Sequence, residues 1–296
     1  MSDTICVLGI DAADYELAKE WDCDNLLLET SNRLTVEPYS LDVPATLEVW
    51  PSIATGASPD DHGITLHPTE SGEFEIRQFL TLFGSKLPDP VKKPLKRAYN
   101  EVSSTGYPTT DRESMFQKGT VYNWPGVTPC YDWDRELEWF RGVQNGDVSE
   151  SEFCQRSFGL AGKGVGWLRS QAMMNVPIAG AHVHYLDSTG HIYADRPERL
   201  REHYERMDEL VAELRDRTDH LLIVSDHGMK TAAVDDAELG VHSMRPFISS
   251  SKDAELPGHV LEIREWVEKL VDGEMEFEDA SEIDAPTEHL ADLGYL

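Results

Sequence analysis

The sequence has few basic residues and few cysteines. Lys and Arg number 26 against 55 Asp and Glu, which gives a formal net charge of −29 over 296 residues. Because contacts to nucleic-acid phosphates need clusters of Lys and Arg, this charge argues against a nucleic-acid-binding surface. The four cysteines, Cys6, Cys23, Cys130 and Cys154, lie far apart without a CxxC pair. Their spacing argues against both a disulfide framework and a cysteine zinc site.

Long hydrophobic runs are also missing. No apolar run approaches the length of about 18 residues that a membrane-spanning helix needs, so no segment is expected to cross a membrane. The first residues, MSDTICVLGIDAADY, lack the basic region and the cleavage site of a signal peptide. We therefore predict a cytoplasmic protein. Cys6 lies in an apolar segment and is expected to be a small core residue.

The acidic residues are spread along the whole chain. A solvated acidic surface is the plain interpretation, and adaptation to high salt is the more specific one. Halophilic adaptation predicts a melting temperature that rises from low to molar KCl, because the Debye length falls to about 3 Å at 1 M and repulsion between carboxylates weakens. Thermal melts across this salt range test the prediction. A melting temperature that does not rise with salt contradicts it.

Hydrophobic patterns predict strands that alternate with helices. Strands are predicted at residues 4–10, 120–126, 181–186, 220–225 and 245–251, and helices at 46–55, 133–174, 197–217 and 259–271. Pro51 is expected to kink or end the first helix, and breaks are expected near Gly146 and at the glycines between 159 and 166. The alternation predicts an α/β fold, a three-layer sandwich with a mostly parallel central sheet. We expect one catalytic domain over residues 1–296, with an irregular substrate-side insertion at about 65–118.

Carboxylates and imidazoles follow three of the predicted strands. The strands end at Asp11, Asp187 and Asp226, and the histidines that follow are His191, His227 and His242. Singly, such an aspartate is usually a helix cap or a turn former, and such a histidine is usually structural. Together at one edge of a sheet, three carboxylates would repel one another and be costly to desolvate unless divalent cations compensate them. Imidazole and carboxylate ligands suit zinc, and also manganese or iron.

Thr46 opens the first predicted helix, and its hydroxyl has two interpretations. It is either an N-cap that accepts a backbone N–H, or a nucleophile placed where free N–H groups and the helix dipole favour a phosphoryl group. The residues alone leave both open.

Four ordered segments resemble a known family. ATLEVWPSIATGASPDDHGI, YLDSTGH, IVSDHGM and GVH occur in the order and spacing typical of the type I phosphodiesterase/nucleotide pyrophosphatase branch of the alkaline phosphatase superfamily. The motifs extend from residue 5 to about residue 250, and the ending HLADLGYL resembles the C-termini of prokaryotic members. The resemblance implies an alkaline phosphatase-like fold. It also implies a metal-dependent phosphohydrolase, a phosphodiesterase or phosphomonoesterase, that acts on a small organic phosphate.

The resemblance further implies two divalent metal ions, usually zinc, with manganese as an alternative. By position, Asp11, Thr46, Asp226 and His227 match the ligands of the metal that activates the nucleophile, and Asp187, His191 and His242 match those of the other metal. Thr46 matches the nucleophile, which would form a phosphothreonine that water then hydrolyses. Sulfatases of the superfamily carry Cys or Ser in a CxPxR-type motif, which the sequence TLEVW does not match. Related phosphoglycerate mutases carry a Ser nucleophile and a large inserted domain.

Some residues depart from the family pattern or have open roles. Glu48 stands where many relatives have proline, and its charge would repel a phosphate unless the side chain points away or meets a cation. Arg77, Asn123 and Arg245 are the candidates for stabilising phosphate oxygens, and His62 is expected to be structural. Two other functions stay open: a catalytically silent metal-containing domain that binds phosphate ligands or proteins, and phosphoryl transfer to an acceptor alcohol. Neither the leaving group nor the oligomeric state is predicted.

Overall fold

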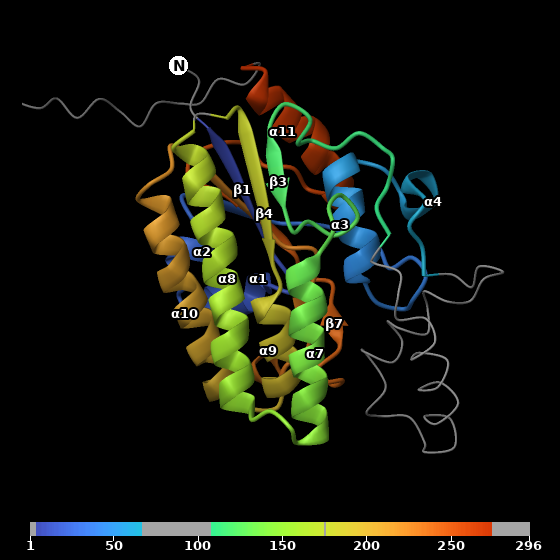
Figure 1. The fold of residues 1–296 in the computed structure, drawn as a ribbon, viewed down its shortest axis with the longest axis vertical. Coiled ribbons are helices and arrows are strands. Elements are labelled where there is room, and N and C mark those ends of the chain that lie inside the picture. Colours follow the sequence, from blue (N-terminus) through green and yellow to red (C-terminus); the bar gives the residue numbers. More distant parts are fainter. Residues whose placement is uncertain (1–3, 67–107, 175, 274–296) are drawn as a thin grey trace, which may run out of the picture.

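The structure is a computed structural model that describes residues 4–66, 108–174 and 176–273. Its elements form a central sheet with helices on both sides (Figure 1). In chain order they are β1 (Ile5–Ile10), α1 (Tyr15–Glu20), α2 (Asp24–Leu27), β2 (Thr30–Arg33), α3 (Thr46–Thr55), α4 (Pro59–His62), β3 (Thr120–Tyr122), α7 (Tyr131–Asn145), α8 (Glu150–Ala172), β4 (Ile178–Val183), α9 (Tyr185–Tyr193), α10 (Pro197–Arg215), β5 (His220–Val224), β6 (Gly228–Met229), the 3-10 helix η1 (Ala232–Val234), β7 (His242–Ser243), β8 (Phe247–Ser250), the 3-10 helix η2 (Val260–Glu262) and α11 (Ile263–Val271).

The central sheet is mixed and mostly parallel. Its strand order is β2-β8-β5-β1-β4-β3, and β6 and β7 form a separate two-stranded sheet. β1 pairs in parallel with β4 and β5, and β3 pairs in parallel with β4. β8 is antiparallel to both β5 and β2. The predicted fold class is therefore confirmed.

Alternate residues of the inner strands face two separate hydrophobic cores. On β1, Leu8 and Ile10 contact one core, which α8 and α10 also line, and Ile5 and Val7 contact the other, which α3 and α11 line. This period-two alternation, with both sets apolar, is what a strand buried on both faces requires. Figure 1 shows α8 and α10 on one side of the strands and α3 and α11 on the other, so the sheet is the middle of three layers.

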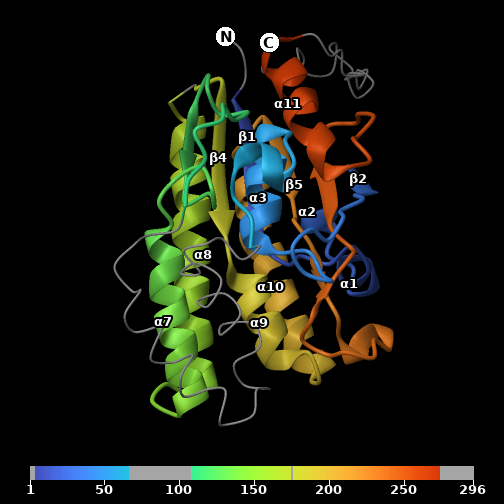
Figure 2. The same ribbon diagram turned by 90° about the vertical axis from the view of Figure 1, so that its right-hand side faces the viewer.

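The carboxyl ends of the parallel strands meet at one edge of the molecule. α9 lies just beyond the end of β4 in both views (Figures 1 and 2). Parallel α/β sheets bind ligands at this edge, because the loops that leave the strands converge there. The segments after β1 and β5, and the start of α9, therefore lie where a site is expected.

Helix α8 differs from the prediction, because it continues without a break through its glycines. It runs from Glu150 to Ala172, and the predicted break occurs only before it, at Gly146. A glycine costs a helix roughly 0.5–1 kcal/mol relative to alanine, but α8 buries Phe153 and Leu168 fully in the core. Gly164 also allows close packing, since a Cβ there would lie 2.8 Å from Cγ1 of Val183.

The helix predicted at 46–55 is confirmed, without the early end that was considered at Pro51, but the bounds of the third predicted strand are wrong. α3 continues through Pro51 to Thr55. Pro51 packs so closely on Gly126 that a Cβ there would lie 2.2 Å from the proline ring. β4 begins at Ile178 and ends at Val183, although glycine and alanine are weak strand formers. Gly180 packs closely under Phe116, where a Cβ would lie 2.2 Å from the ring. Asp187 consequently lies in the first turn of α9.

All four cysteines are buried free thiols, which confirms the absence of a disulfide framework and the core position of Cys6. Within the described ranges, no helix has the length and apolarity needed to span a membrane. Most of the insertion predicted at 65–118 lies outside the described residues.

Candidate metal centre

The seven predicted site residues lie together at the carboxyl edge of the sheet. Asp11 directly follows β1, Asp226 and His227 follow β5, Thr46 begins α3, Asp187 and His191 lie on α9, and His242 begins β7. Six are buried, and His191 is partly buried. The tertiary structure therefore brings together residues that are up to 231 positions apart in the sequence, counting from Asp11 to His242.

The first group of ligands, here called the Asp11 cluster, consists of Asp11, Asp226 and His227. Their ligand atoms all lie within 4.8 Å of one another. His227 Nε2 lies 3.4 Å from Asp11 Oδ1 and 3.2 Å from Asp226 Oδ2. Thr46 Oγ1 joins this cluster, at 3.0 Å from His227 Nε2 and 3.4 Å from Asp11 Oδ1.

The second group, here called the Asp187 cluster, consists of Asp187, His191 and His242, also within 4.8 Å of one another. The Nε2 atoms of His191 and His242 each lie 3.4 Å from Asp187 Oδ1. The two clusters adjoin, because the rings of His227 and His242 stack with centroids 3.7 Å apart. Histidines of two separate elements, α9 and β7, thus converge on one carboxylate oxygen of Asp187.

Several ligand atoms of both clusters are buried without a hydrogen-bond partner. They are Asp187 Oδ1, His191 Nε2, Asp226 Oδ2 and His242 Nε2. Unpartnered buried polar atoms are costly, and a bound cation removes that cost. The Nδ1 atoms of the cluster histidines also support cation binding.

The Nδ1 atoms of the three cluster histidines each lie beside a backbone carbonyl. His191 Nδ1 is 3.0 Å from Gly240 O, His242 Nδ1 is 2.8 Å from Pro44 O, and His227 Nδ1 is 3.0 Å from Gly228 O. A proton on Nδ1 leaves the lone pair on Nε2, which is the arrangement of metal-binding histidines. These donor sets, carboxylates with imidazoles, fit divalent cations such as zinc or manganese.

The pKa values of the carboxylates are shifted in opposite directions in the two clusters. Burial, followed by the neighbouring Asp226 carboxylate, raises the pKa of Asp11 well above its ordinary value. Burial also raises the pKa of Asp226 to about 7. Burial acts in the same direction on Asp187, but His191 and then His184 hold the pKa of that carboxyl well below its usual range. A cation at the Asp11 cluster would stabilise both ionised carboxylates there.

Zinc affinity should fall as the pH falls through about 7, the value to which burial raises the pKa of Asp226. A cation binds the ionised carboxylate, so below this pKa each bound ion must displace a proton, and affinity falls by up to about tenfold per pH unit for each proton displaced. Above it, Asp226 is already ionised and no longer contributes to the pH dependence. Competition titrations with a chromophoric chelator, made at several pH values, measure the effect. Affinity independent of pH would contradict it.

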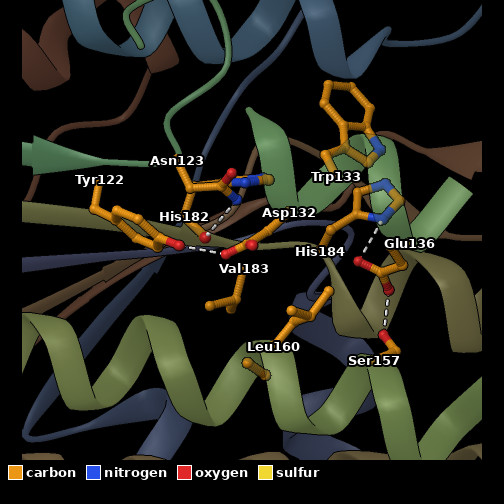
Figure 3. Close-up of a pocket in the computed structure, with 11 residues that line it drawn as sticks. Tyr122, Asn123, Asp132, Trp133, Glu136, Ser157, Leu160, His182, Val183 and His184 are labelled. Carbon is orange, nitrogen blue, oxygen red and sulfur yellow. Dashed lines mark hydrogen bonds and ion pairs between the residues drawn. The ribbon is translucent and has the colours of Figure 1, made fainter. Parts of the chain in front are cut away.

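Two histidines of the segment AHVHYLD contact the cluster carboxylates and were not predicted as site residues, and His184 forms a further group of possible ligands with Asp11 and Asp187. His182 Nε2 lies 3.0 Å from Asp11 Oδ2, and His184 Nε2 lies 3.0 Å from Asp187 Oδ2. Figure 3 shows His184 beside Glu136, which in turn contacts Ser157. The signal in the sequence was the HxH spacing at a strand end, where His182 belongs to β4 and His184 follows it as the N-cap of α9.

Thr46 does not cap α3. The N-cap residue is Ala45, and no side-chain hydrogen bond caps the helix there. The capping interpretation of the Thr46 hydroxyl is therefore wrong.

Glu48 points away from the site. It lies two residues after Thr46, hence on nearly the opposite side of α3. Its carboxylate accepts hydrogen bonds from the backbone N–H of Leu66, at 2.7 Å, and from Ser40. Its charge therefore faces the flanking loops, and the objection that it would repel a bound phosphate is removed.

The residues predicted as candidates for stabilising phosphate oxygens, and His62, differ in what they contact in the structure. Arg245 binds Asp14 at 2.7 Å and Asp236 at 2.7 Å, so it is a structural residue and not a free phosphate ligand. Asn123 donates its side-chain N–H to the carbonyl of His182, and its role toward phosphate stays a prediction. Arg77 lies outside the described residues. His62 is buried against Ser52 Oγ at 3.0 Å, which confirms its structural role.

Solved structures with similar folds are distant. Alkaline phosphatase from the Antarctic bacterium TAB5 is 9% identical, with a TM-score of 0.43 over 93% of this chain and 100% of its own. Murine ectonucleotide pyrophosphatase/phosphodiesterase 5 is 13% identical, with a TM-score of 0.37 over 77% of this chain and 57% of its own. A protein from Pyrococcus horikoshii is 11% identical, with a TM-score of 0.44 over 94% and 100%.

Comparison with curated protein sequences gave no match. Comparison with protein families identified the type I phosphodiesterase/nucleotide pyrophosphatase model, which matches residues 5–291. This range includes every residue of both clusters and Thr46. The chain therefore belongs to the type I phosphodiesterase/nucleotide pyrophosphatase family, within the alkaline phosphatase superfamily.

Proposed function

We propose that the protein is a metal-dependent phosphohydrolase whose nucleophile is the Thr46 hydroxyl. The observation that carries the proposal is the position of Thr46 Oγ1, 3.0 Å from His227 Nε2 and 3.4 Å from Asp11 Oδ1. A hydroxyl beside a ligand cluster, and free of any capping role, is placed for nucleophilic attack. It also lies at the first turn of α3, where the helix dipole favours an anionic group.

The ligand groups would hold two divalent cations, which we propose to be zinc, with manganese as the alternative. The Asp11 cluster with Thr46 would hold one, and the Asp187 cluster the other. When bound, such cations supply positive charge that favours the ionised hydroxyl and compensates the phosphate oxygens.

The proposed reaction has two steps. In the first, Thr46 Oγ forms a bond to phosphorus while the bond from phosphorus to the leaving oxygen breaks, and the alcohol departs with a proton. In the second, water cleaves the phosphothreonine, which releases the phosphate product and restores the hydroxyl. The family implies a phosphorylated small molecule as substrate. We propose a small organic phosphate, either a monoester or a diester, with Glu48 turned away from it.

Hydrolysis of chromogenic aryl phosphates tests this function. The purified protein is stripped with a chelator, reloaded with zinc or manganese, and assayed on an aryl monoester and an aryl diester. We expect no turnover after stripping, turnover after reloading, and a preference for one ester class. A protein that binds metal and hydrolyses neither ester would instead fit a catalytically silent domain. A product phosphorylated on an added alcohol would identify phosphoryl transfer.

A further inference from the structure

The two carboxylates Asp11 and Asp187 are held in the same way. In each, Oδ1 faces the atoms of its cluster, and Oδ2 faces a histidine of the segment HVH. For Asp11, Oδ1 lies 3.4 Å from His227 Nε2 and Oδ2 lies 3.0 Å from His182 Nε2. For Asp187, Oδ1 lies 3.4 Å from His242 Nε2 and Oδ2 lies 3.0 Å from His184 Nε2.

His182 is held in place by its burial and by contact with Trp50 of α3. It is the fifth residue of β4, and its side chain is fully buried. Trp50 packs edge-on against its ring, with centroids 4.8 Å apart, and also donates its indole N–H to Asp11 Oδ2 at 3.1 Å. Two buried N–H groups from different elements thus converge on the same oxygen of Asp11.

His184 is fixed by a second set of side chains. It precedes α9 as the N-cap residue, and its Nδ1 lies 3.1 Å from Ser188 Oγ and 3.5 Å from Glu136 Oε2. Glu136 is buried on α7 and accepts a hydrogen bond from Ser157 of α8 (Figure 3). The imidazole is therefore held between Asp187 on one side and the pair of helices α7 and α8 on the other.

We propose that His182 and His184 are positioning residues of the metal centre, each dedicated to one carboxylate ligand. His182 orients Asp11 for the first cation, and His184 orients Asp187 for the second. A ligand carboxylate that is hydrogen-bonded on one oxygen presents the other in a fixed direction, and loss of such a partner typically weakens metal binding about 10–100-fold. This inference rests on the metal binding in the proposed function.

Zinc titrations in two single-cluster backgrounds test the assignment. Asp226→Ala leaves the Asp187 cluster intact, and His242→Ala leaves the Asp11 cluster intact. With Asp226→Ala, adding His184→Ala should weaken zinc binding about 10–100-fold, and adding His182→Ala should leave it unchanged. With His242→Ala, the effects should be reversed. His184 Nε2 also lies 4.0 Å from Asp11 Oδ2, so its effect there should be small.

Conservative and control variants separate positioning from general structure. Glutamine places an amide N–H near the position of histidine Nε2, so His182→Gln and His184→Gln should recover most of the lost affinity. The matched control is His220→Ala, which alters a buried histidine at the start of β5, at the opposite end of the sheet. It should not change zinc affinity. Near-ultraviolet circular dichroism of each variant reports whether the fold is intact.

Five results would overturn the inference. Unchanged zinc affinity in all His182 and His184 variants would overturn it while the proposed function stands. Equal losses in both backgrounds, or no recovery with glutamine, would overturn it because a merely structural role behaves in that way. A third zinc equivalent in the wild type that disappears in His184→Ala would make His184 a ligand. A folded wild type that binds no divalent cation would overturn the proposed function as well.

Discussion

Replacing Thr46 with alanine should lower the turnover of a phosphate ester by about a thousandfold or more, because no covalent intermediate can form. The fold should remain nearly as stable as the wild type. The hydroxyl contacts Asp11 and His227 and caps no backbone group. Its removal therefore leaves the capping of α3 unchanged. Turnover number and melting temperature, measured on the same preparation reloaded with zinc, check both parts.

Thr46→Ser should retain part of the activity, since the hydroxyl survives. Thr55→Ala is the matched control, because Thr55 is a buried threonine at the other end of the same helix, and its hydroxyl binds the carbonyl of Pro51. That variant should keep its turnover. If Thr46→Ala kept more than about a tenth of the wild-type kcat, a loss below about 1.4 kcal/mol, Thr46 would not be the nucleophile.

Asp14→Ala should lower the free energy of unfolding by about 3–5 kcal/mol, the usual cost of removing one partner of a buried ion pair. Asp14 is fully buried, and its Oδ2 accepts hydrogen bonds from Arg245 Nε at 2.7 Å, Ser243 Oγ at 2.8 Å and Met229 N at 3.1 Å. Gly228 lies so close that a Cβ there would be 2.2 Å from the same oxygen. Urea unfolding of the metal-free protein measures the loss.

The same carboxylate joins β6 to β7, the strand that begins with His242. Asp14→Ala should therefore also weaken zinc binding at the Asp187 cluster. Asp236→Ala is the matched control, because Asp236 binds the same guanidinium but its side chain is 17% exposed, against 0% for Asp14. Its removal should cost only about 1 kcal/mol. Equal losses in the two variants would show that burial of Asp14 is not the cause.

Interactions in the structure also explain why an acidic residue is tolerated beside the proposed nucleophile. Glu48 is used to hold the loops that flank α3, through Ser40 and Leu66. On a helix, a side chain two positions away faces the other side, so the carboxylate never needs to approach the phosphate. The departure from the usual proline therefore bears on the neighbouring loops and not on the charge of the site.

The sequence by itself was sufficient to predict β1 and β5, the strands that precede the ligands Asp11 and Asp226. β1 and β5 are short runs of apolar residues buried on both faces, and such runs identify inner strands directly. The polar residue that ends each run then marks the carboxyl edge of the sheet, where Asp11 and Asp226 lie. α10 was predictable for a similar local reason, since its apolar residues recur at helical spacing.

Tertiary structure alone decided what those residues contact. α8 persists through four glycines because buried contacts along its length outweigh their local cost, and no window of sequence reports such contacts. Arg245 looked free for phosphate but is bound to Asp14, 231 positions away. The roles we assign to His182 and His184 depend on which carboxylate oxygen each one faces. Local sequence determines periodicity and burial, whereas partners distant in the chain are chosen only when the layers pack.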